Sequence, residues 1–266
     1  MKTKKLLKLL VFNCLWAAVP FAGTAQDALF RVFAAEISAE RPSLSCFTSS
    51  QMGFRIRNDF CTKEMTFAEM TGQLTVRKNV LTASINHYGY TNYGNFRLSV
   101  GYGRNFGNRF GMTARIFYLL AHARGYPARH SLCADFSFAY RLSPKLLFDA
   151  AIYNPFMLRY GIVGQEVIPM NFVIGCSYAP LRKLLTSITV SKFLPGAWEV
   201  DCRFLTQPVE PLFLAAECSN LRASVYIGWR YKQMLFSVRA AWYYRISVSP
   251  EIGGWYFNEK KVMTIE

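Results

Sequence analysis

Histidine, acidic side chains and metal-binding cysteine patterns are all scarce in this chain of 266 residues. Charged residues make up 18% of it, with 16 acidic side chains against 31 basic ones, and there are three histidines. Seven cysteines occur, but no Cys-x-x-Cys pair or Cys/His cluster has the spacing of a zinc site. We therefore expect no metal and no cofactor. The sequence leaves open whether Cys46 and Cys61 form a disulfide.

Long apolar runs are absent after residue 25, which excludes a helix that spans a membrane. Residues 1–25 combine a basic start, an apolar stretch and the small residues Gly23-Thr24-Ala25. This pattern predicts a signal peptide that is cleaved before Gln26. The alternative is an uncleaved anchor, but Lys8 and Asn13 shorten the apolar core below a spanning length.

A catalytic dyad is also missing. A membrane-embedded lipase would need serine and histidine on one face. His130 and Ser131 are neighbours, and neighbours on a strand point to opposite faces. His87, His122 and His130 instead lie on apolar registers near predicted strand ends, where a ring suits the lipid headgroup level. We expect no enzymatic activity.

What the sequence does contain is a two-residue alternation that runs from residue 53 to residue 257. Every second residue from Leu221 to Tyr231 is apolar, and most of those between are not. Successive side chains of a strand point to opposite faces, so each such segment has one apolar face. Many such segments of about ten residues, separated by turns, are typical of a closed barrel in a bilayer. Aromatic residues, at 16% of the chain, fit rings at two membrane interfaces.

The alternation predicts an all-β protein, a transmembrane antiparallel β-barrel of about 14 strands (12–14), after the signal peptide. Residues 26–50 form an N-terminal periplasmic or plug segment, residues 51–257 the barrel and residues 258–266 a polar tail. A soluble sandwich or lipocalin-like barrel is the competing fold, but the apolar faces are too numerous and too aromatic for one small core. The predicted strands are 53–60, 65–77, 80–89, 95–105, 109–122, 127–141, 145–154, 169–178, 183–193, 197–205, 210–218, 221–231, 233–246 and 251–257.

The connections between these strands differ at the two ends. Inner turns are predicted at 77–79, 106–108, 142–144, 179–181, 207–208 and 232–233, and all are short. Outer connections include the long segment 155–169. Short inner turns and longer outer loops are expected of outer-membrane barrels. Gly101 and Gly103 share an inward register, which makes room where the wall bends or a plug approaches.

Arginine dominates the face that points away from lipid. One interpretation is a lumen that binds carboxylates or selects anions, because guanidinium groups pair well with carboxylates. The other is a ladder of charges across strands that fills and stiffens the lumen. The candidate solute-binding residues are Arg97, Arg115, Arg222, Arg230, Arg239, Arg245, Glu199 and Asp201. Of these, Arg222, Arg230, Arg239 and Arg245 stand on strands without an acidic residue of their own.

Aromatic residues near the predicted interfaces suit a girdle at the headgroup level. A ligand cage is the alternative interpretation, and girdles are commoner. The predicted girdle residues are Tyr88, Trp198, Trp229, Trp242, Tyr244 and Trp255.

A family resemblance rests on motifs that follow one another across residues 51–257. They are RNDFCTKEMTFAEMTGQL, GYTNYGNFRLSVGYGRNFGNRFGMTARIFYLL, FAYRLSPKLLFDAAIYNPF, VIPMNFVIGCSYAP and VSPEIGGWYF. In this order they resemble barrels of the PorV/PorQ type from the Bacteroidota, which are similar to long-chain fatty-acid transporters. The resemblance implies an outer-membrane barrel that passes hydrophobic solutes or takes part in type IX secretion and surface attachment.

Two functions stay open from the sequence. The first is a passive outer-membrane channel or transporter for small hydrophobic or anionic solutes. The second is a non-conducting barrel that acts as an interaction or scaffold component of type IX secretion or surface attachment, with residues 157–168 as the contact loop. Expected partners are outer-membrane lipid and lipopolysaccharide, the barrel-assembly machinery and, in the second case, secretion or attachment proteins.

Nucleic acid is not an expected partner, although the formal net charge is +15. An exported chain with arginines on its non-lipid face places that charge in the lumen and at the rims. We expect the protein in the outer membrane of a Gram-negative cell, exported through its signal peptide.

Overall fold

The computed structural model describes residues 24–37, 40–62, 64–159, 167–244 and 247–258. Fourteen antiparallel strands form a closed barrel, in which each strand pairs with its neighbours in the chain and β1 pairs with β14. This confirms the predicted fold class and strand number. The strands are β1 Gln51–Asn58, β2 Thr66–Val76, β3 Asn79–Tyr90, β4 Tyr93–Phe106, β5 Phe110–Ala123, β6 Arg129–Ser143, β7 Leu146–Tyr153, β8 Met170–Leu181, β9 Leu184–Leu194, β10 Trp198–Val209, β11 Leu212–Ser219, β12 Arg222–Tyr231, β13 Met234–Tyr243 and β14 Val248–Phe257.

Three helical segments accompany the strands within the described residues. They are α2 Thr24–Ile37 and the 3-10 turns η2 Pro42–Phe47 and η3 Asp59–Cys61. No described helix has the length and apolar character needed to cross a membrane. The predicted cleavage point after Ala25 falls at the second residue of α2, whereas most of the predicted signal peptide and of the polar tail lies outside the described residues.

The outer face of the barrel is apolar along its strands. Ile174, Leu132 and Val238 have exposed fractions of 63%, 62% and 58%, while their neighbours Val173, Cys133 and Ser237 point inward and are buried. This is the two-residue alternation of the sequence in three dimensions. A closed cylinder pairs its backbone amides internally, so an apolar outer face of this kind suits hydrocarbon.

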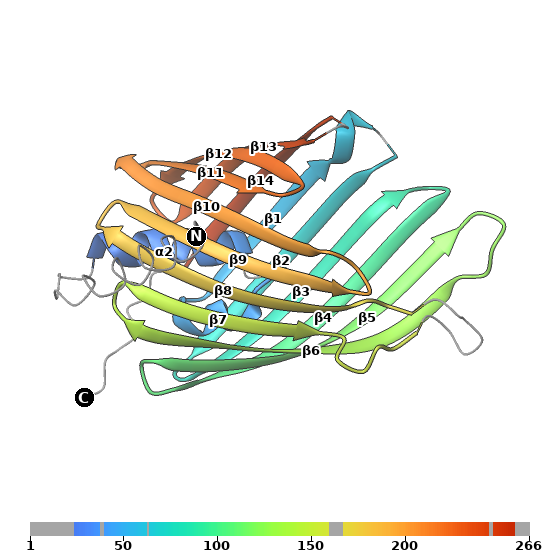
Figure 1. Ribbon diagram of the computed structural model, residues 1–266, viewed down its shortest axis with the longest axis horizontal. Helices are drawn as coiled ribbons and strands as arrows, with labels where there is room; N and C mark the ends of the chain where they lie inside the picture. Colours follow the sequence, from blue (N-terminus) through green and yellow to red (C-terminus); the bar gives the residue numbers. More distant parts are fainter. Residues whose placement is uncertain (1–23, 38–39, 63, 160–166, 245–246, 259–266) are drawn as a thin grey trace, which may run out of the picture.

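The two ends of the barrel differ in the length of their connections. Residues 77–78, 107–109, 144–145, 182–183, 210–211 and 232–233 form short turns at one end, which we call the turn end. The first residue of β1 and the last residue of β14 also lie there, and Figure 1 shows α2 toward the same end. The opposite loop end carries the longer connections, among them residues 59–65 and 154–169.

Two of the six predicted turns lie further along the chain than predicted. Turns predicted at 179–181 and 207–208 lie at 182–183 and 210–211, because the strands continue past Pro180 and Pro208. The pairing register shifts between Tyr178 and Leu181 and between Thr206 and Val209. Proline has no N–H to donate, and each of these prolines sits in a bulge that leaves its position unpaired.

The described residues that precede β1 lie inside the barrel and are called the plug here (24–37 and 40–50). Leu29 and Val32 of α2 are almost fully buried, in one cluster with Phe213, Leu235 and Trp255 of the wall. The plug therefore occupies the lumen near the turn end, in the second of the two locations that the sequence left open.

Small residues of the wall make the room that η2 needs. A Cβ atom at Gly111 would stand 2.6 Å from the Cβ atom of Cys46, and one at Gly103 would stand 3.1 Å from its Sγ atom. The structure thus bears out the expectation that Gly103 admits a plug, and Gly111 does the same. Gly101 instead makes room for the side chain of Arg115.

Candidate solute-binding site

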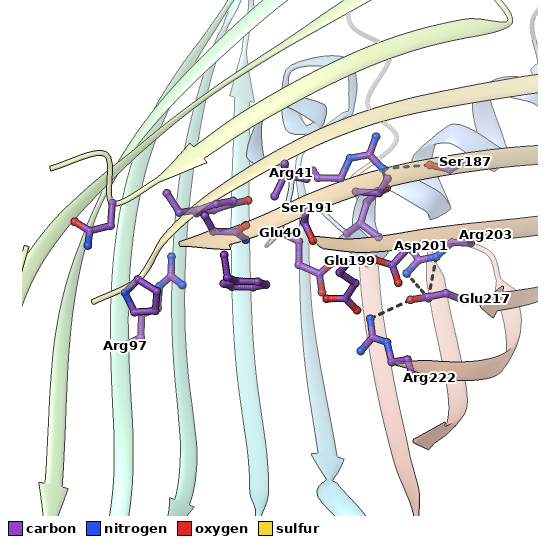
Figure 2. A pocket seen from close by; sticks show the side chains of 18 of the residues that line it. Glu40, Arg41, Arg97, Ser187, Ser191, Glu199, Asp201, Arg203, Glu217 and Arg222 are labelled. Carbon is purple, nitrogen blue, oxygen red and sulfur yellow. Dashed lines mark hydrogen bonds and ion pairs between the residues drawn. The ribbon is translucent and has the colours of Figure 1, made fainter. Parts of the chain in front are cut away.

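A cavity of about 470 Å³ lies in the lumen between the plug and the loop end (Figure 2). The plug forms its floor with Phe33, Ile37 and the Glu40–Arg41 pair, and the inner faces of the strands form its walls. Much of the surface is apolar. Its apolar wall residues are Phe117, Leu119, Ile168, Pro169, Val173 and Phe193. The volume is in the range of pockets that hold small organic ligands.

Carboxylates gather on the β10 side of the cavity. Glu199 and Asp201 are two residues apart on β10, so both point into the lumen, and Glu40 reaches the same cavity from the plug. None of the three has an ion pair within the described part of the chain, and Asp201 Oδ1 is buried without a hydrogen-bond partner. Burying a carboxylate without a positively charged partner is energetically unfavourable.

A fourth carboxylate on this side, Glu217 of β11, is already neutralised. Arg203 donates to its Oε2 atom from Nε at 3.1 Å and from Nη2 at 2.6 Å. Arg222 donates to its Oε1 atom from Nη2 at 3.0 Å. With two guanidinium groups against the carboxylates of Glu217, Glu199, Asp201 and Glu40, this side keeps an excess of negative charge.

Arg97 faces the cavity from β4, which is six strands from β10 in the closed order of fourteen. Its guanidinium carbon lies 4.1 Å from the centre of the Phe117 ring. Its Nη2 atom is 3.7 Å from Asp135 Oδ2, but Arg115 holds the same carboxylate more tightly, with N–O distances of 3.1 and 2.8 Å. Arg97 is therefore only partly neutralised, and 30% of its side chain is exposed.

Buried charges attach the plug beneath the cavity. Arg41 pairs with both oxygens of Asp149, with Nε 2.6 Å from Oδ2, and also donates to Ser187 and Thr189 of β9 at 3.2 Å. In α2, Glu36 Oε2 accepts from Arg239 Nη2 at 2.8 Å. Burial raises the pKa of Glu36, and the positive charge of Arg239 opposes that rise.

The predicted solute-binding residues divide into two groups. Arg97, Arg222, Glu199 and Asp201 line the cavity. Arg115 and Arg239 point inward but are held by Asp135 and by Glu36, and Arg230 donates from Nε to the carbonyl oxygen of Lys232 near the turn end. Arg245 lies outside the described residues.

Arg222 and Arg239 stand on strands without an acidic residue of their own, as predicted, but each still has an acidic partner. Their partners come from a neighbouring strand and from the plug, as Glu217 and Glu36. The sequence of a single strand reveals neither a partner on the neighbouring strand nor a partner in the plug.

Four of the six predicted girdle residues have the outward placement that a girdle requires. Trp198, Trp229, Trp242 and Tyr244 are exposed on the outer face. Trp255 instead shares the inward register of Glu251 and Gly253 and is buried against the plug cluster. Its assignment to the girdle is wrong, because Gly253 and Gly254 interrupt the apolar alternation that would identify the outer face.

Tyr88 is the other misplaced girdle residue. It shares the register of the inward-facing Ser84 and Asn86, whereas its neighbour His87 is exposed on the outer face. His87, His122 and His130 lie on the outer face of their strands, as their apolar registers predicted.

The residues that sequence reasoning missed are those of the plug. Glu40 and Arg41 lie in a stretch without periodicity, and Arg41 finds Asp149 more than a hundred positions later in the chain. No local pattern signals such a contact. The Cys46–Cys61 disulfide that the sequence left open is not formed, because both thiols are free. Cys46 contacts Met112 of β5, whereas Cys61 contacts Val248 of β14.

Several solved structures of channels and transporters have a similar fold. The Pseudomonas putida toluene transporter TodX aligns with a TM-score of 0.62 and 8% identity, over 82% of this chain and 92% of TodX. The CymD monoaromatic hydrocarbon channel aligns with 0.62 and 8%, over 84% and 93%. A Pseudomonas aeruginosa FadL homologue aligns with 0.60 and 8%, over 90% and 99%. No family model and no curated protein matches the sequence. At such identities the likeness concerns the fold.

Proposed function

We propose that this protein is an outer-membrane transport barrel that takes up small, largely apolar solutes through the cavity above its plug. The observation that carries the proposal is a mostly apolar cavity of about 470 Å³ inside a closed barrel whose outer face is itself apolar. The predicted signal peptide supports export. The proteins with similar folds include a toluene transporter and a monoaromatic hydrocarbon channel, which supports an apolar solute.

The orientation follows from the connections. Outer-membrane barrels keep short turns on the periplasmic side, so we place the turn end in the periplasm and the loop end outside. The cavity then lies on the side from which a solute arrives, and the plug lies on the side toward which it must leave. Transport in this scheme requires the plug to move.

Of the two chemical classes predicted from sequence, the cavity favours the hydrophobic one. Three of the six candidate lumen arginines, Arg115, Arg222 and Arg239, are paired with carboxylates, which argues against a lumen that selects anions by a general positive field. A scaffold function has no use for a lined cavity in the lumen. The likeness to PorV/PorQ barrels, a source in the Bacteroidota and a part in type IX secretion stay predictions.

Uptake of an apolar dye across an intact outer membrane tests this function. N-phenyl-1-naphthylamine is held back by lipopolysaccharide and fluoresces once it reaches the lipid behind it. Cells that produce the protein should gain fluorescence faster than cells that do not. The variant Thr189→Trp, which fills the cavity from β9, should remove most of that gain.

The matched control is Ile188→Trp, because Ile188 is the adjacent residue of β9 on the outer face. It should leave uptake unchanged. Equal uptake with and without the protein, or equal loss in both tryptophan variants, would contradict transport through the cavity.

A further inference from the structure

We propose that the solute taken into this cavity is bipolar, with a cationic end at Glu199 and Asp201 and an anionic end at Arg97. The inference rests on the proposed transport function and specifies its solute class. An apolar body between the two charged ends would lie against the aromatic and aliphatic lining. Neither a hydrocarbon nor a simple anion satisfies all of these groups.

The cationic end is assigned by uncompensated negative charge. Glu199 and Asp201 face the cavity without an ion pair in the described residues, and Asp201 Oδ1 is both buried and unpaired. The nearby guanidinium groups of Arg203 and Arg222 are already bonded to Glu217. An ammonium group can donate three hydrogen bonds and would offset part of the excess negative charge on this wall.

The anionic end is assigned by Arg97. The ring of Phe117 holds its guanidinium at 4.1 Å, so the group is already oriented before a solute binds. Arg115 makes the short bonds to the carboxylate of Asp135, and Arg97 stays at 3.7 Å from it. The remaining donors of Arg97 suit the forked geometry of a carboxylate or phosphate.

The separation of the two ends follows from the topology of the barrel. β4 and β10 lie almost opposite one another in the closed order of strands, and Figure 2 shows Arg97 across the cavity from Glu199 and Asp201. Apolar residues such as Phe117, Leu119 and Phe193 line the same cavity. The arrangement fits an amine and an acid joined by an apolar chain better than charges on adjacent atoms.

Calorimetric titration of the purified full-length barrel tests this with three probes of equal chain length. They are 6-aminohexanoate, hexanoate and hexylamine, each corrected with protein-free detergent. We expect 6-aminohexanoate to bind at least about tenfold more tightly than either singly charged probe, a difference of about 1.4 kcal/mol.

Two sets of variants separate the ends. Arg97→Gln should weaken hexanoate and 6-aminohexanoate about tenfold and leave hexylamine unchanged. The double variant Glu199→Gln with Asp201→Asn should weaken hexylamine and 6-aminohexanoate and leave hexanoate unchanged. Glu199→Gln alone gives the same test with less disturbance, and Glu210→Gln in an exposed turn is the control.

The bipolar assignment is overturned if 6-aminohexanoate binds no more tightly than hexanoate, or if each variant weakens all three probes alike. Dye uptake that is still blocked by Thr189→Trp would show in that case that the transport function stands without it. If the protein gives no dye uptake but binds the three probes as expected, the transport function is contradicted and the bipolar site stands.

Discussion

Single buried charges decide how the plug is held. Arg41 is 3% exposed and Asp149 is 2% exposed, so their pairing takes place away from water. Removing one member of a buried ion pair leaves the other charge without compensation and typically costs about 3–5 kcal/mol. The wall keeps its strand pairing without this contact, because the ladders of β7 and β8 consist of backbone bonds.

We therefore expect Asp149→Asn to loosen the plug while the barrel stays folded. Cys46 is buried beside β5, so its alkylation by a water-soluble maleimide reports plug release. Peptide mass spectrometry should show Cys46 modified at least about tenfold faster in the variant, and unchanged in Glu210→Gln. Unchanged alkylation in Asp149→Asn would mean that this pair does not hold the plug.

At the scale of single residues, the sequence predicts orientation well where apolar alternation is unbroken. Trp229 and Trp242 stand in such segments and face outward as predicted. Trp255 follows two glycines and faces the plug instead. Glycine carries no side chain to mark a face, so the alternation loses its phase there. The strand residues that line the cavity were therefore within reach of prediction, whereas the plug residues that pair with the strands were not.

At the scale of elements, η2 fits the wall through the absence of side chains. A valine at position 111 would place its Cβ atom 2.6 Å from that of Cys46, which is closer than side-chain atoms pack. Overpacking of this kind costs about 1–3 kcal/mol. Because β5 is held by ladders on both sides, the plug is the part that must give way.

Gly111→Val should accordingly displace η2 and raise the rate of Cys46 alkylation by roughly 5- to 100-fold. Gly72→Val is the matched control, since nothing lies within 4 Å of a Cβ atom at Gly72. A plug that is equally protected in both variants would show that η2 does not pack against β5 as described.

Strand ends show the limit of turn prediction from composition. Proline-containing segments at 179–181 and 207–208 look like turns, yet the chain passes through them as bulges and turns at 182–183 and 210–211. The number of strands and their pairing order were predictable because each strand has a long apolar face. The exact hairpin positions depend on which residues can leave the ladder unpaired, and that depends on the neighbouring strand.

At the scale of the whole molecule, positive charge collects at the turn end. Among the exposed residues of the described turns there is one acid, Glu210. The exposed basic residues are Arg77, Lys78, Arg109, Arg182, Lys183 and Lys232. They belong to four different hairpins and so are spread around the rim. In the proposed orientation this rim faces the periplasmic interface, where basic residues attract anionic lipid headgroups at about 1 kcal/mol for each residue near the surface.

We expect the barrel to insert faster and more completely into vesicles with phosphatidylglycerol than into pure phosphatidylcholine vesicles. Replacing Lys78, Lys183 and Lys232 by glutamine should remove about half of the difference, with a loss of roughly 3 kcal/mol in the preference at low salt. Heat-modifiable mobility measures insertion. The same preference in the triple variant would show that the rim does not contact these lipids.

The central claim is that the described residues before β1 close a barrel that otherwise offers a path through the membrane. Single-channel recording in planar bilayers tests it most directly, by comparing the full mature chain with a folded variant that lacks residues 26–50. We expect no steady conductance from the full chain and discrete open steps from the shortened one. Steady open steps from the full chain, or a folded shortened barrel that stays silent, would contradict the account.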